Sequence, residues 1–412
     1  MTDETEVVTV ASVTAIHAPT LNRIDSPADS VDFSLVLGGP LYQVYRRARL
    51  TGSTLELVYR RVAAIVILTW LPLLLLAVAA GPAGIAVPFW RDCDAQARFL
   101  VALPLLVAGE LVVHKRTRGV MRNFLDRAIV SPADTPRFLA EISSVIRVRN
   151  STVLEIALLI FTFTVGQWSW RTQNAGAANT WYGVGGPGGW HLTPAGYWLA
   201  FVAIPAFQFI LLRWYLRMLL WAWLLWRVSR LPLHITCTHP DRAGGLGFLG
   251  KSAYAFAPIL GAQGALLAGL VGNRVLYQGA TLLSFKVELV ALIGVFMVVV
   301  LGPLTVFARQ MLHAKHRALG EYGLLANEYV RGFEQRWLGS NREDAELLGS
   351  SDIQSLADLA GSYDIIREMR IVPFGLHDVS LLAAATAVPL APLALTVVSL
   401  DELVGHLLQI LF

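Results

Sequence analysis

The sequence predicts an all-α protein, a bundle of transmembrane helices with amphipathic helices on its cytoplasmic side. Of the 412 residues, 55% are hydrophobic and 15% are charged, whereas charged residues make up about a quarter of a soluble domain. Uncharged apolar runs recur along the chain, and about twenty such residues cross a bilayer as a helix. Basic residues are concentrated in alternate segments between the runs, as in cytoplasmic loops. Together these observations predict a multi-pass membrane protein.

Seven crossings are expected, one for each apolar run. The runs cover 62–80, 99–109, 156–170, 197–212, 253–272, 289–308 and 379–400. The second run is short and needs Glu110 and Val112 to complete its span. The last run contains Pro389 and Pro392 and could instead enter the membrane and return on the same side. Six crossings are therefore the alternative.

The distribution of basic residues places the N-terminus in the cytoplasm. In that orientation, 28 of the 33 lysines and arginines fall in cytoplasmic segments, where positive charge is retained during insertion. This retention, together with contact to anionic lipid headgroups, accounts for the isoelectric point near 9.1. We therefore expect membrane lipids, and no nucleic acid, as partners.

The chain divides into four regions. Residues 1–38 lack the apolar core of a signal peptide and are expected to form a disordered cytoplasmic tail. The remaining regions are a transmembrane bundle with cytoplasmic helices at 114–150, a cytoplasmic helical segment, and a C-terminal transmembrane or re-entrant segment, over 39–308, 309–377 and 378–412.

Helix-start signals mark the helices outside the membrane. Asp134 precedes Pro136 as a capping acid, and Phe138, Ile142 and Val145 then share one face of an amphipathic helix. A second start signal lies at Ser351–Asp352, after an apolar stripe at helical spacing made by Tyr322, Ala326, Tyr329, Phe333 and Trp337. By contrast, glycine and proline in the outward loop 171–194 predict no regular structure there.

The stretch GGLGFLGKS at 244–252 matches two nucleotide-binding patterns. A phosphate loop needs a strand before the glycines and a soluble α/β domain around them, and neither is predicted. We expect no nucleotide, haem or flavin cofactor. The stretch either forms a tight turn permitted by its glycines or binds a lipid phosphate or other anion at a helix start, through Arg242, Gly244, Gly245, Gly247, Lys251 and Ser252.

Four residues with metal-ligating side chains stand just upstream, namely His234, Cys237, His239 and Asp241. Their spacing matches no standard zinc pattern, and Asp241 after Pro240 equally suits a turn acid that binds its own backbone. A metal site is the less favoured interpretation. The other cysteine, Cys93, is expected on the opposite side of the membrane, which excludes a disulfide between Cys93 and Cys237.

Three stretches carry a resemblance to a known family. They are THPDRAGGLGFL at 238–249, LLGSSDIQSLADL at 347–359 and MRIVPF at 369–374. With these motifs, the chain from about residue 39 onward resembles a family of uncharacterised bacterial inner-membrane proteins. The resemblance implies a bacterial multi-pass setting. It implies no activity and no catalytic residues.

Ionisable residues within the apolar runs give the best functional lead, because they are expensive in a bilayer and mark pairing or a pathway. Arg60 and Arg61 suit the headgroup level before the first crossing. A cluster is expected at similar depth in the inner leaflet, formed by Glu110, Glu155, Arg213 and Arg217, with Gln208 and Gln263 near the midplane. Interhelical pairing, with the arginines reaching the headgroups, is the favoured interpretation of these charges, and a conduction or transport role is the alternative. Prolines within the runs predict kinks at Pro72, Pro104, Pro205, Pro258 and Pro303.

Three functions follow from these features. Transport or conduction of a small solute or ion uses the buried charges and the kinked helices. A signalling or assembly scaffold, which could be a homo-oligomer, uses the cytoplasmic helices as a partner surface. A membrane enzyme on lipid phosphates ranks third, because no nucleophile and base pair is evident in the sequence.

Overall fold

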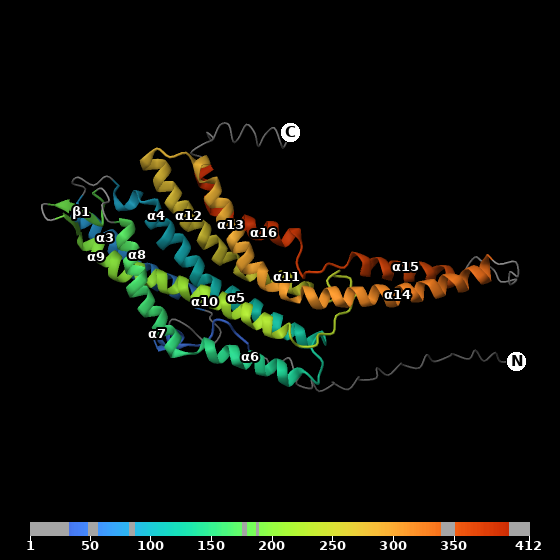
Figure 1. Ribbon diagram of the computed structural model, residues 1–412. Helices are drawn as coiled ribbons and strands as arrows, with labels where there is room; N and C mark the ends of the chain where they lie inside the picture. Colours follow the sequence, from blue (N-terminus) through green and yellow to red (C-terminus); the bar gives the residue numbers. More distant parts are fainter. Residues whose placement is uncertain are drawn as a thin grey trace, which may run out of the picture.

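The protein is helical, as predicted, and its described part is a bundle of long helices with a two-helix arm (Figure 1). The structure is a computed structural model that describes residues 33–47, 57–81, 87–174, 179–186, 189–338 and 351–394. Most of the predicted cytoplasmic tail and the last part of the seventh apolar run lie outside these ranges.

Seven helices in the described ranges are long and apolar enough to cross a membrane. They are Val58–Ala80, Cys93–Asp126, Thr152–Thr172, Pro194–Val228, Gly247–Gln278, Leu282–Trp337 and Leu376–Leu393. Each predicted run lies within one of these helices, except for the part of the last run outside the described residues. These lengths and compositions are those of an integral membrane protein.

Most crossings consist of several consecutive helical segments. The α-helices of the first four crossings are α2 (Val58–Thr69), α3 (Leu71–Ala80), α4 (Cys93–Gln96), α5 (Leu103–Asp126), α7 (Thr152–Phe161), α8 (Gln167–Asn174), α9 (Pro194–Trp198) and α10 (Ile204–Val228). Those of the last three are α11 (Gly247–Ser252), α12 (Ala257–Gln278), α13 (Lys286–Leu301), α14 (Ala308–Trp337), α16 (Leu376–Ala387) and α17 (Ala391–Ala394). Short helices outside them are α1 (Pro40–Arg47), α6 (Thr135–Arg149) and α15 (Ser351–Glu368).

The predicted helix interruptions lie where the prolines are. Each proline is the second residue of a new helical segment, beginning at Leu71, Leu103, Ile204, Ala257 and Gly302. Proline has no N–H and its ring clashes with the preceding turn. The chain before it therefore changes its hydrogen-bond pattern, as in the π-helical turns Ala97–Ala102 and Leu199–Ala203.

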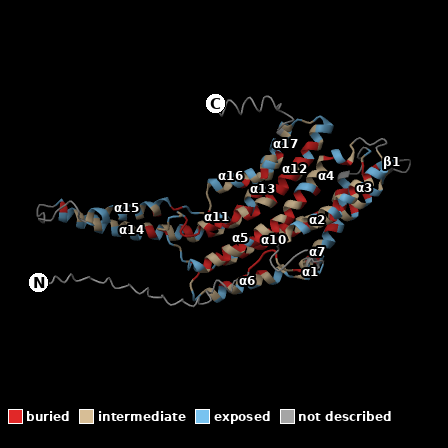
Figure 2. Ribbon diagram, turned by 180° about the vertical axis from the view of Figure 1, so that it is seen from behind, coloured by how far each residue is buried: buried red, intermediate tan, exposed pale blue. Residues whose placement is uncertain are grey.

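The fifth crossing lies at the centre of the bundle. In its most apolar stretch 67% of residues are buried, against 17% in the third crossing. Small residues allow neighbours to approach α12 closely. A Cβ at Gly264 would lie 1.9 Å from the carbonyl oxygen of Thr386 on α16, and one at Gly269 would lie 2.8 Å from that of Cys93 on α4. Figure 2 shows the resulting buried interior along α5, α10 and α12.

The two ends of the bundle differ, as Figure 1 shows. The basic end carries the C-terminal ends of α5 and α10, the start of α7, helix α6 and the α14–α15 arm. The β end carries a small antiparallel hairpin of β1 (Gly183–Gly186) and β2 (Gly189–Leu192), in which Val184 pairs with His191.

The hairpin corrects the prediction of an irregular loop at 171–194. Gly183 is part of β1 because an aromatic ring occupies the space of a side chain there. A Cβ at Gly183, which pairs with Leu192, would lie 2.0 Å from the ring of Trp190, so only glycine fits against this ring. The prediction treated the glycines of this segment as residues that interrupt regular structure, and it therefore missed this close approach.

Helix α6 confirms the predicted amphipathic helix. Phe138, Ile142 and Val145 are all buried, and α6 packs against α10. The predicted cap is different, because the Asp134 side chain makes no capping hydrogen bond and instead accepts one from the hydroxyl of Ser131. The first part of the predicted cytoplasmic region, residues 114–126, continues α5.

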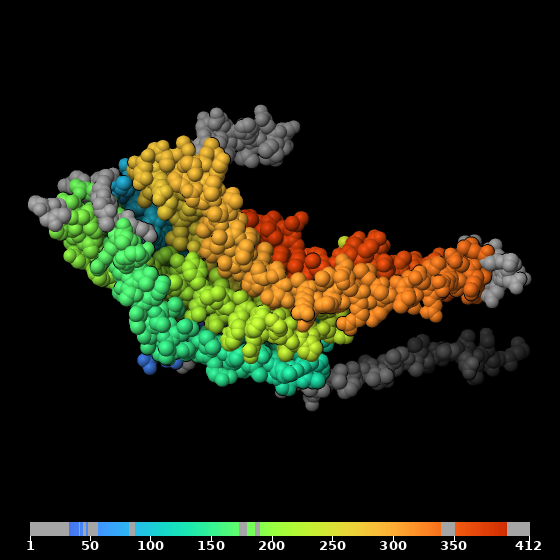
Figure 3. Space-filling view, viewed as in Figure 1, coloured from blue at the N-terminus to red at the C-terminus, as the bar shows by residue number. Residues whose placement is uncertain are grey.

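The α14–α15 arm projects from the basic end as two packed helices (Figure 3). Helix α15 begins at Ser351, as predicted. The apolar stripe of α14 faces α15, with Trp337 buried. Asp352 fixes the tip of the arm, since its Oδ2 accepts hydrogen bonds from Trp337 Nε1 at 3.0 Å and from Arg336 at 3.1 Å.

Candidate functional site

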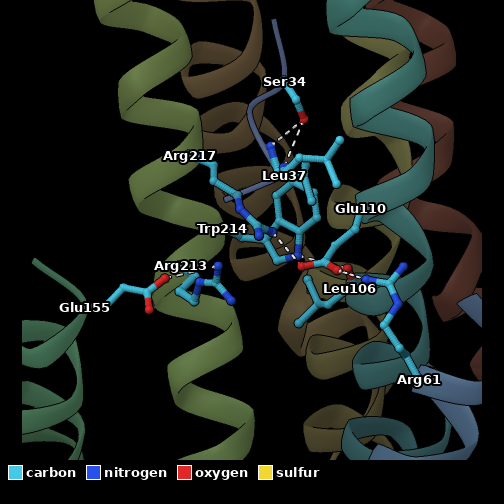
Figure 4. A network of polar contacts seen from close by, with 10 residues as sticks. Ser34, Leu37, Arg61, Leu106, Glu110, Glu155, Arg213, Trp214 and Arg217 are labelled. Atoms are coloured by element: carbon cyan, nitrogen blue, oxygen red, sulfur yellow. Dashed lines mark hydrogen bonds and ion pairs between the residues drawn. The ribbon is translucent and has the colours of Figure 1, made fainter. Parts of the chain in front are cut away.

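A cluster of buried ion pairs joins four crossings near the basic end (Figure 4). Glu110 on α5 accepts a hydrogen bond from Arg217 on α10 at 2.9 Å through Oε1, and Arg61 on α2 donates to its Oε2. Arg213, one turn before Arg217, lies 3.3 Å from Glu155 on α7. The structure thus brings together the four charged residues that the sequence singled out.

Burying these charged side chains costs free energy, so their burial indicates that the charges are closely paired. Its five members are between 0% and 8% exposed. Buried ion pairs pay a large desolvation penalty that only good geometry and further hydrogen bonds offset. Trp214 supplies part of that setting. Its Nε1 donates to the carbonyl oxygen of Leu106 at 2.9 Å, and the Arg217 guanidinium lies 4.8 Å from the centre of its ring.

Arg61 is the member that sequence reasoning missed. It was expected at the headgroup level beside Arg60, yet it is fully buried whereas Arg60 is exposed. The face of the helix on which Arg61 lies could have shown its burial. Arg61 shares a face of α2 with Thr69, eight residues on, and these two are the buried residues of that helix.

An ordered segment, residues 33–39, covers the cluster at the basic end, and we call it the strap. The prediction of a disordered tail was wrong here. Phe33, Ser34, Leu35 and Val36 are at most 3% exposed. The strap begins with an apolar cluster after a polar stretch of sequence. Apolar residues alone, however, do not show where a segment packs, so the strap was not predicted.

Polar contacts fix the strap to the bundle. Ser34 Oγ lies 2.8 Å from Nδ1 of His114, and Arg149 donates to the Ser34 carbonyl oxygen. Gly39 has a φ of +85°, and a Cβ there would lie 2.6 Å from Glu155 Oε1. The strap therefore contacts an acidic member of the cluster directly.

Almost no space remains between the strap and the charges. The cavity lined by Glu155, Arg213, Arg217 and the strap has a volume of about 10 Å³, roughly the space of one water molecule. In this conformation the described residues close the bundle beneath the strap.

The β end, by contrast, contains a pocket of about 630 Å³ between α4, α8, α10 and α12. Its wall combines charges with aromatic rings. Arg98 and Asp94 form a two-pronged ion pair at 2.8 and 2.9 Å, and Trp170 lies opposite. Gln208 also lines the pocket. Its Oε1 is buried and accepts no hydrogen bond from the described residues.

Asp92 holds the wall of this β-end pocket together. Its carboxylate accepts hydrogen bonds from Trp181 Nε1 at 2.8 Å and from Asn273 on α12 at 2.7 Å. It also caps α4 through two backbone amides. Burial raises the pKa of the neighbouring Tyr182, so this hydroxyl stays protonated.

The pocket and the ion pairs lie on the same stretch of α10. Gln208 precedes Arg213 by five residues, about 7.5 Å at 1.5 Å per residue. Both face the third crossing, since a Cβ at Gly166 would lie 2.3 Å from Gln208 Oε1. The predicted midplane partner Gln263 lies elsewhere and accepts a hydrogen bond from Tyr215 at 3.2 Å.

The glycine-rich stretch forms a turn around a carboxylate of its own chain. Asp241 accepts hydrogen bonds from the amides of Ala243, Gly245 and Gly247 at 2.8, 3.1 and 2.9 Å. Burial acts to raise the pKa of Asp241, but these three donors outweigh it and the pKa lies below its ordinary value. The amides of Gly245 and Gly247, considered for a lipid phosphate, therefore bind Asp241.

The other residues of the predicted anion site have separate roles. Gly244 has a positive φ of 65° and lies against Ile235. Arg242 pairs with Glu368 on α15 at 2.7 Å. Lys251 is exposed, and the hydroxyl of Ser252 donates to the carbonyl oxygen of Leu249.

Of the four residues considered for a metal, only two meet. His239 Nδ1 lies 3.0 Å from Asp241 Oδ1. Cys237 is buried, which raises the pKa of its thiol, and His234 contributes its backbone N–H to Ile129. Over the ranges that the structure describes, no three His, Cys, Asp or Glu side chains form a group that could hold a metal ion.

Comparisons with protein families, with curated proteins and with solved structures found no match to this chain.

Proposed function

We propose that the protein is a multi-pass protein of a bacterial inner membrane, with its N-terminus and basic end in the cytoplasm. The bias of lysine and arginine toward that end supports the orientation. The resemblance to uncharacterised bacterial inner-membrane proteins supports the setting. On this orientation the β-end pocket opens on the outer side.

Within that membrane the protein transports a small polar solute or ion. One observation carries this proposal: the β-end pocket of about 630 Å³ reaches Gln208, five residues before the buried Arg213–Glu155 pair on the same helix. A pocket open at one end and closed by ion pairs at the other is the arrangement expected of a carrier that faces outward.

The closure at the basic end consists of discrete contacts that can separate. Arg213 and Glu155 join α10 to α7, and the strap covers both. Helix α7 makes few other inward contacts, with Val153 77% and Ile160 58% exposed. Movement of α7 away from α10 would open the cavity between them, whereas the Glu110 ion pairs would keep α2, α5 and α10 together.

The test is flux through purified protein in liposomes, measured with entrapped indicators for H⁺, Na⁺, K⁺ and Cl⁻ and with labelled glycine and glucose. Wild-type protein is expected to raise the flux of at least one probe tenfold over empty liposomes. Gln208→Met should reduce that flux at least fivefold. Gln354→Met, on the exposed face of α15, is the matched control. Wild-type flux equal to that of empty liposomes for every probe would refute transport of these solutes.

An assembly function is the second candidate, because the α14–α15 arm exposes apolar side chains away from the bundle. Leu324 is 73% and Leu338 75% exposed. A groove of about 510 Å³ lies between Leu325 and Asp352. Such a surface is typical of an interface, and a second copy of the chain would supply the same leucines. Leu324→Glu with Leu325→Glu should convert a dimer in nanodiscs to a monomer in mass photometry; a monomeric wild type would exclude the homo-oligomer.

A further inference from the structure

A second cleft lies at the basic end, on the surface between α6, α7 and α10. Its volume is about 610 Å³. The wall is mainly apolar and is formed by Val148, Val153, Leu154, Ala157 and Trp223. Two of these side chains, Val148 at 39% and Val153 at 77%, are exposed. Hydrocarbon can pack on such a wall.

Polar groups line one side of the same cleft, namely Ser144, Arg147 and Ser151. Arg147 is in the last turn of α6, and Ser151 caps the start of α7. The Ser144 hydroxyl donates to the carbonyl oxygen of Glu141, whereas Ser151 accepts from the Leu154 amide and keeps its own proton to donate. The cleft thus presents a cation and a hydroxyl donor beside an apolar wall. This combination matches a phosphate attached to an acyl chain.

Arg147 has no hydrogen-bond or ion-pair partner within the described residues, unlike the arginines near it. Arg149 donates to Ser34 and to Asn150. Arg227 pairs with Glu141 at 2.5 Å. The Arg147 guanidinium is therefore free to form charge-assisted hydrogen bonds to a phosphate from outside the chain.

The cleft lies beside the start of a candidate membrane crossing. Helix α6 precedes the third crossing, which begins at Thr152, so Arg147 lies just before the chain enters the apolar layer. Trp223 is at the same end of α10, with the Arg227 guanidinium 5.9 Å from its ring. Tryptophan and arginine together mark the interface between headgroups and hydrocarbon.

We propose that this cleft binds an anionic glycerophospholipid of the cytoplasmic leaflet. The phosphate contacts Arg147 and the hydroxyl of Ser151, and an acyl chain lies on Leu154, Ala157 and Trp223. The leaflet rests on the orientation proposed above, but the binding does not depend on transport. Basic pockets between transmembrane helices on the cytoplasmic side are known to bind such headgroups.

A lipid fits better than a free phosphate. Most of the wall is apolar, and covering it with an acyl chain stabilises the complex in proportion to the apolar area. One exposed arginine gives a dissolved phosphate little affinity. The glycine-rich turn is a weaker site, because Asp241 already takes its Gly245 and Gly247 amides.

The test is native mass spectrometry of the full-length protein released from nanodiscs of phosphatidylcholine with a minority of phosphatidylglycerol. Wild type should retain phosphatidylglycerol in preference to phosphatidylcholine. Arg147→Gln should lower that preference about fivefold, the effect of roughly 1 kcal/mol for a basic residue near the bilayer surface. The control is Arg137→Gln on the same helix, which removes an arginine 74% exposed and should leave the preference unchanged.

Further arms separate the sources of the phosphate. Ala157→Trp should fill the acyl part of the cleft and reduce retention of both lipids. Glycerol 3-phosphate at 10 mM should not displace phosphatidylglycerol; displacement would show a site for soluble phosphates and overturn the proposal. Equal losses in Arg147→Gln and Arg137→Gln would show diffuse surface attraction and would also overturn it. None of these readouts measures flux, so a failed transport assay leaves them intact.

Discussion

Arg217 on α10 and Glu110 on α5 form a hydrogen-bonded ion pair of 2.9 Å across 107 residues of sequence. Both side chains are at least nine-tenths buried. The pair fixes two central crossings against each other at the depth where the cavity beneath the strap closes. Breaking this pair should therefore destabilise the bundle.

Glu110→Gln should destabilise the protein by about 3 to 5 kcal/mol, because removing one partner leaves buried charge uncompensated. The measurement is the free energy of unfolding by SDS titration in mixed micelles. Glu141→Gln is the control. It breaks the pair with Arg227, whose side chain is 40% exposed, and should change stability by less than about 1 kcal/mol. Similar losses in the two variants would contradict the buried pairing.

Gly264→Ala should weaken the packing of α16 on α12, because the added methyl would meet the Thr386 carbonyl oxygen at 1.9 Å. Overpacking of this kind costs about 1 to 3 kcal/mol. Gly294→Ala in α13 meets nothing within 4 Å and should stabilise its helix by up to about 1 kcal/mol. Thermal unfolding in detergent should therefore shift in opposite directions. A rise for both variants would place α16 away from α12.

Asp241→Asn should destabilise the glycine-rich turn by about 2 kcal/mol at neutral pH, since the carboxylate accepts three amide hydrogen bonds. The folded pKa is lowered from 3.8, so this stabilisation is fully present above that value and is lost as pH falls through the lowered pKa. Unfolding of wild type and variant should be compared between pH 7 and pH 3. A difference that grows toward pH 3 would contradict the assignment.

The orientation can be tested with single cysteines in a variant carrying Cys93→Ser and Cys237→Ser. Thr281→Cys lies in the exposed connection at the β end, and Ser355→Cys lies on the exposed face of α15. A membrane-impermeant maleimide added to intact cells should modify position 281 alone. After permeabilisation it should modify both. Labelling of position 355 in intact cells would reverse the proposed topology.

Local pattern was sufficient for much of the fold. The apolar runs predicted the seven described helices that are long and apolar enough to cross a membrane, and the five in-run prolines predicted where segments begin. The spacing of Phe138, Ile142 and Val145 predicted the buried face of α6. These features depend on side-chain period, span length and the missing proline N–H, all properties of neighbouring residues.

The charged site was only half predictable. Glu110, Glu155, Arg213 and Arg217 stood out because charge is expensive in an apolar run. The fifth member, Arg61, did not stand out, because it lies at the edge of a run and looked like an interfacial residue. The strap was missed because nothing in residues 33–39 shows that Ser34 meets His114, 80 residues away.

The sequence by itself therefore determined that this chain forms membrane-length helices and which residues need burial partners. Tertiary structure alone decided the pairing of Glu110, the use of the glycine-rich turn by Asp241, and the contrast between an open β-end pocket and a closed basic end. The reason is physical. Helix formation depends on neighbours along the chain, whereas a buried charge or a cavity depends on groups brought together from distant segments by packing.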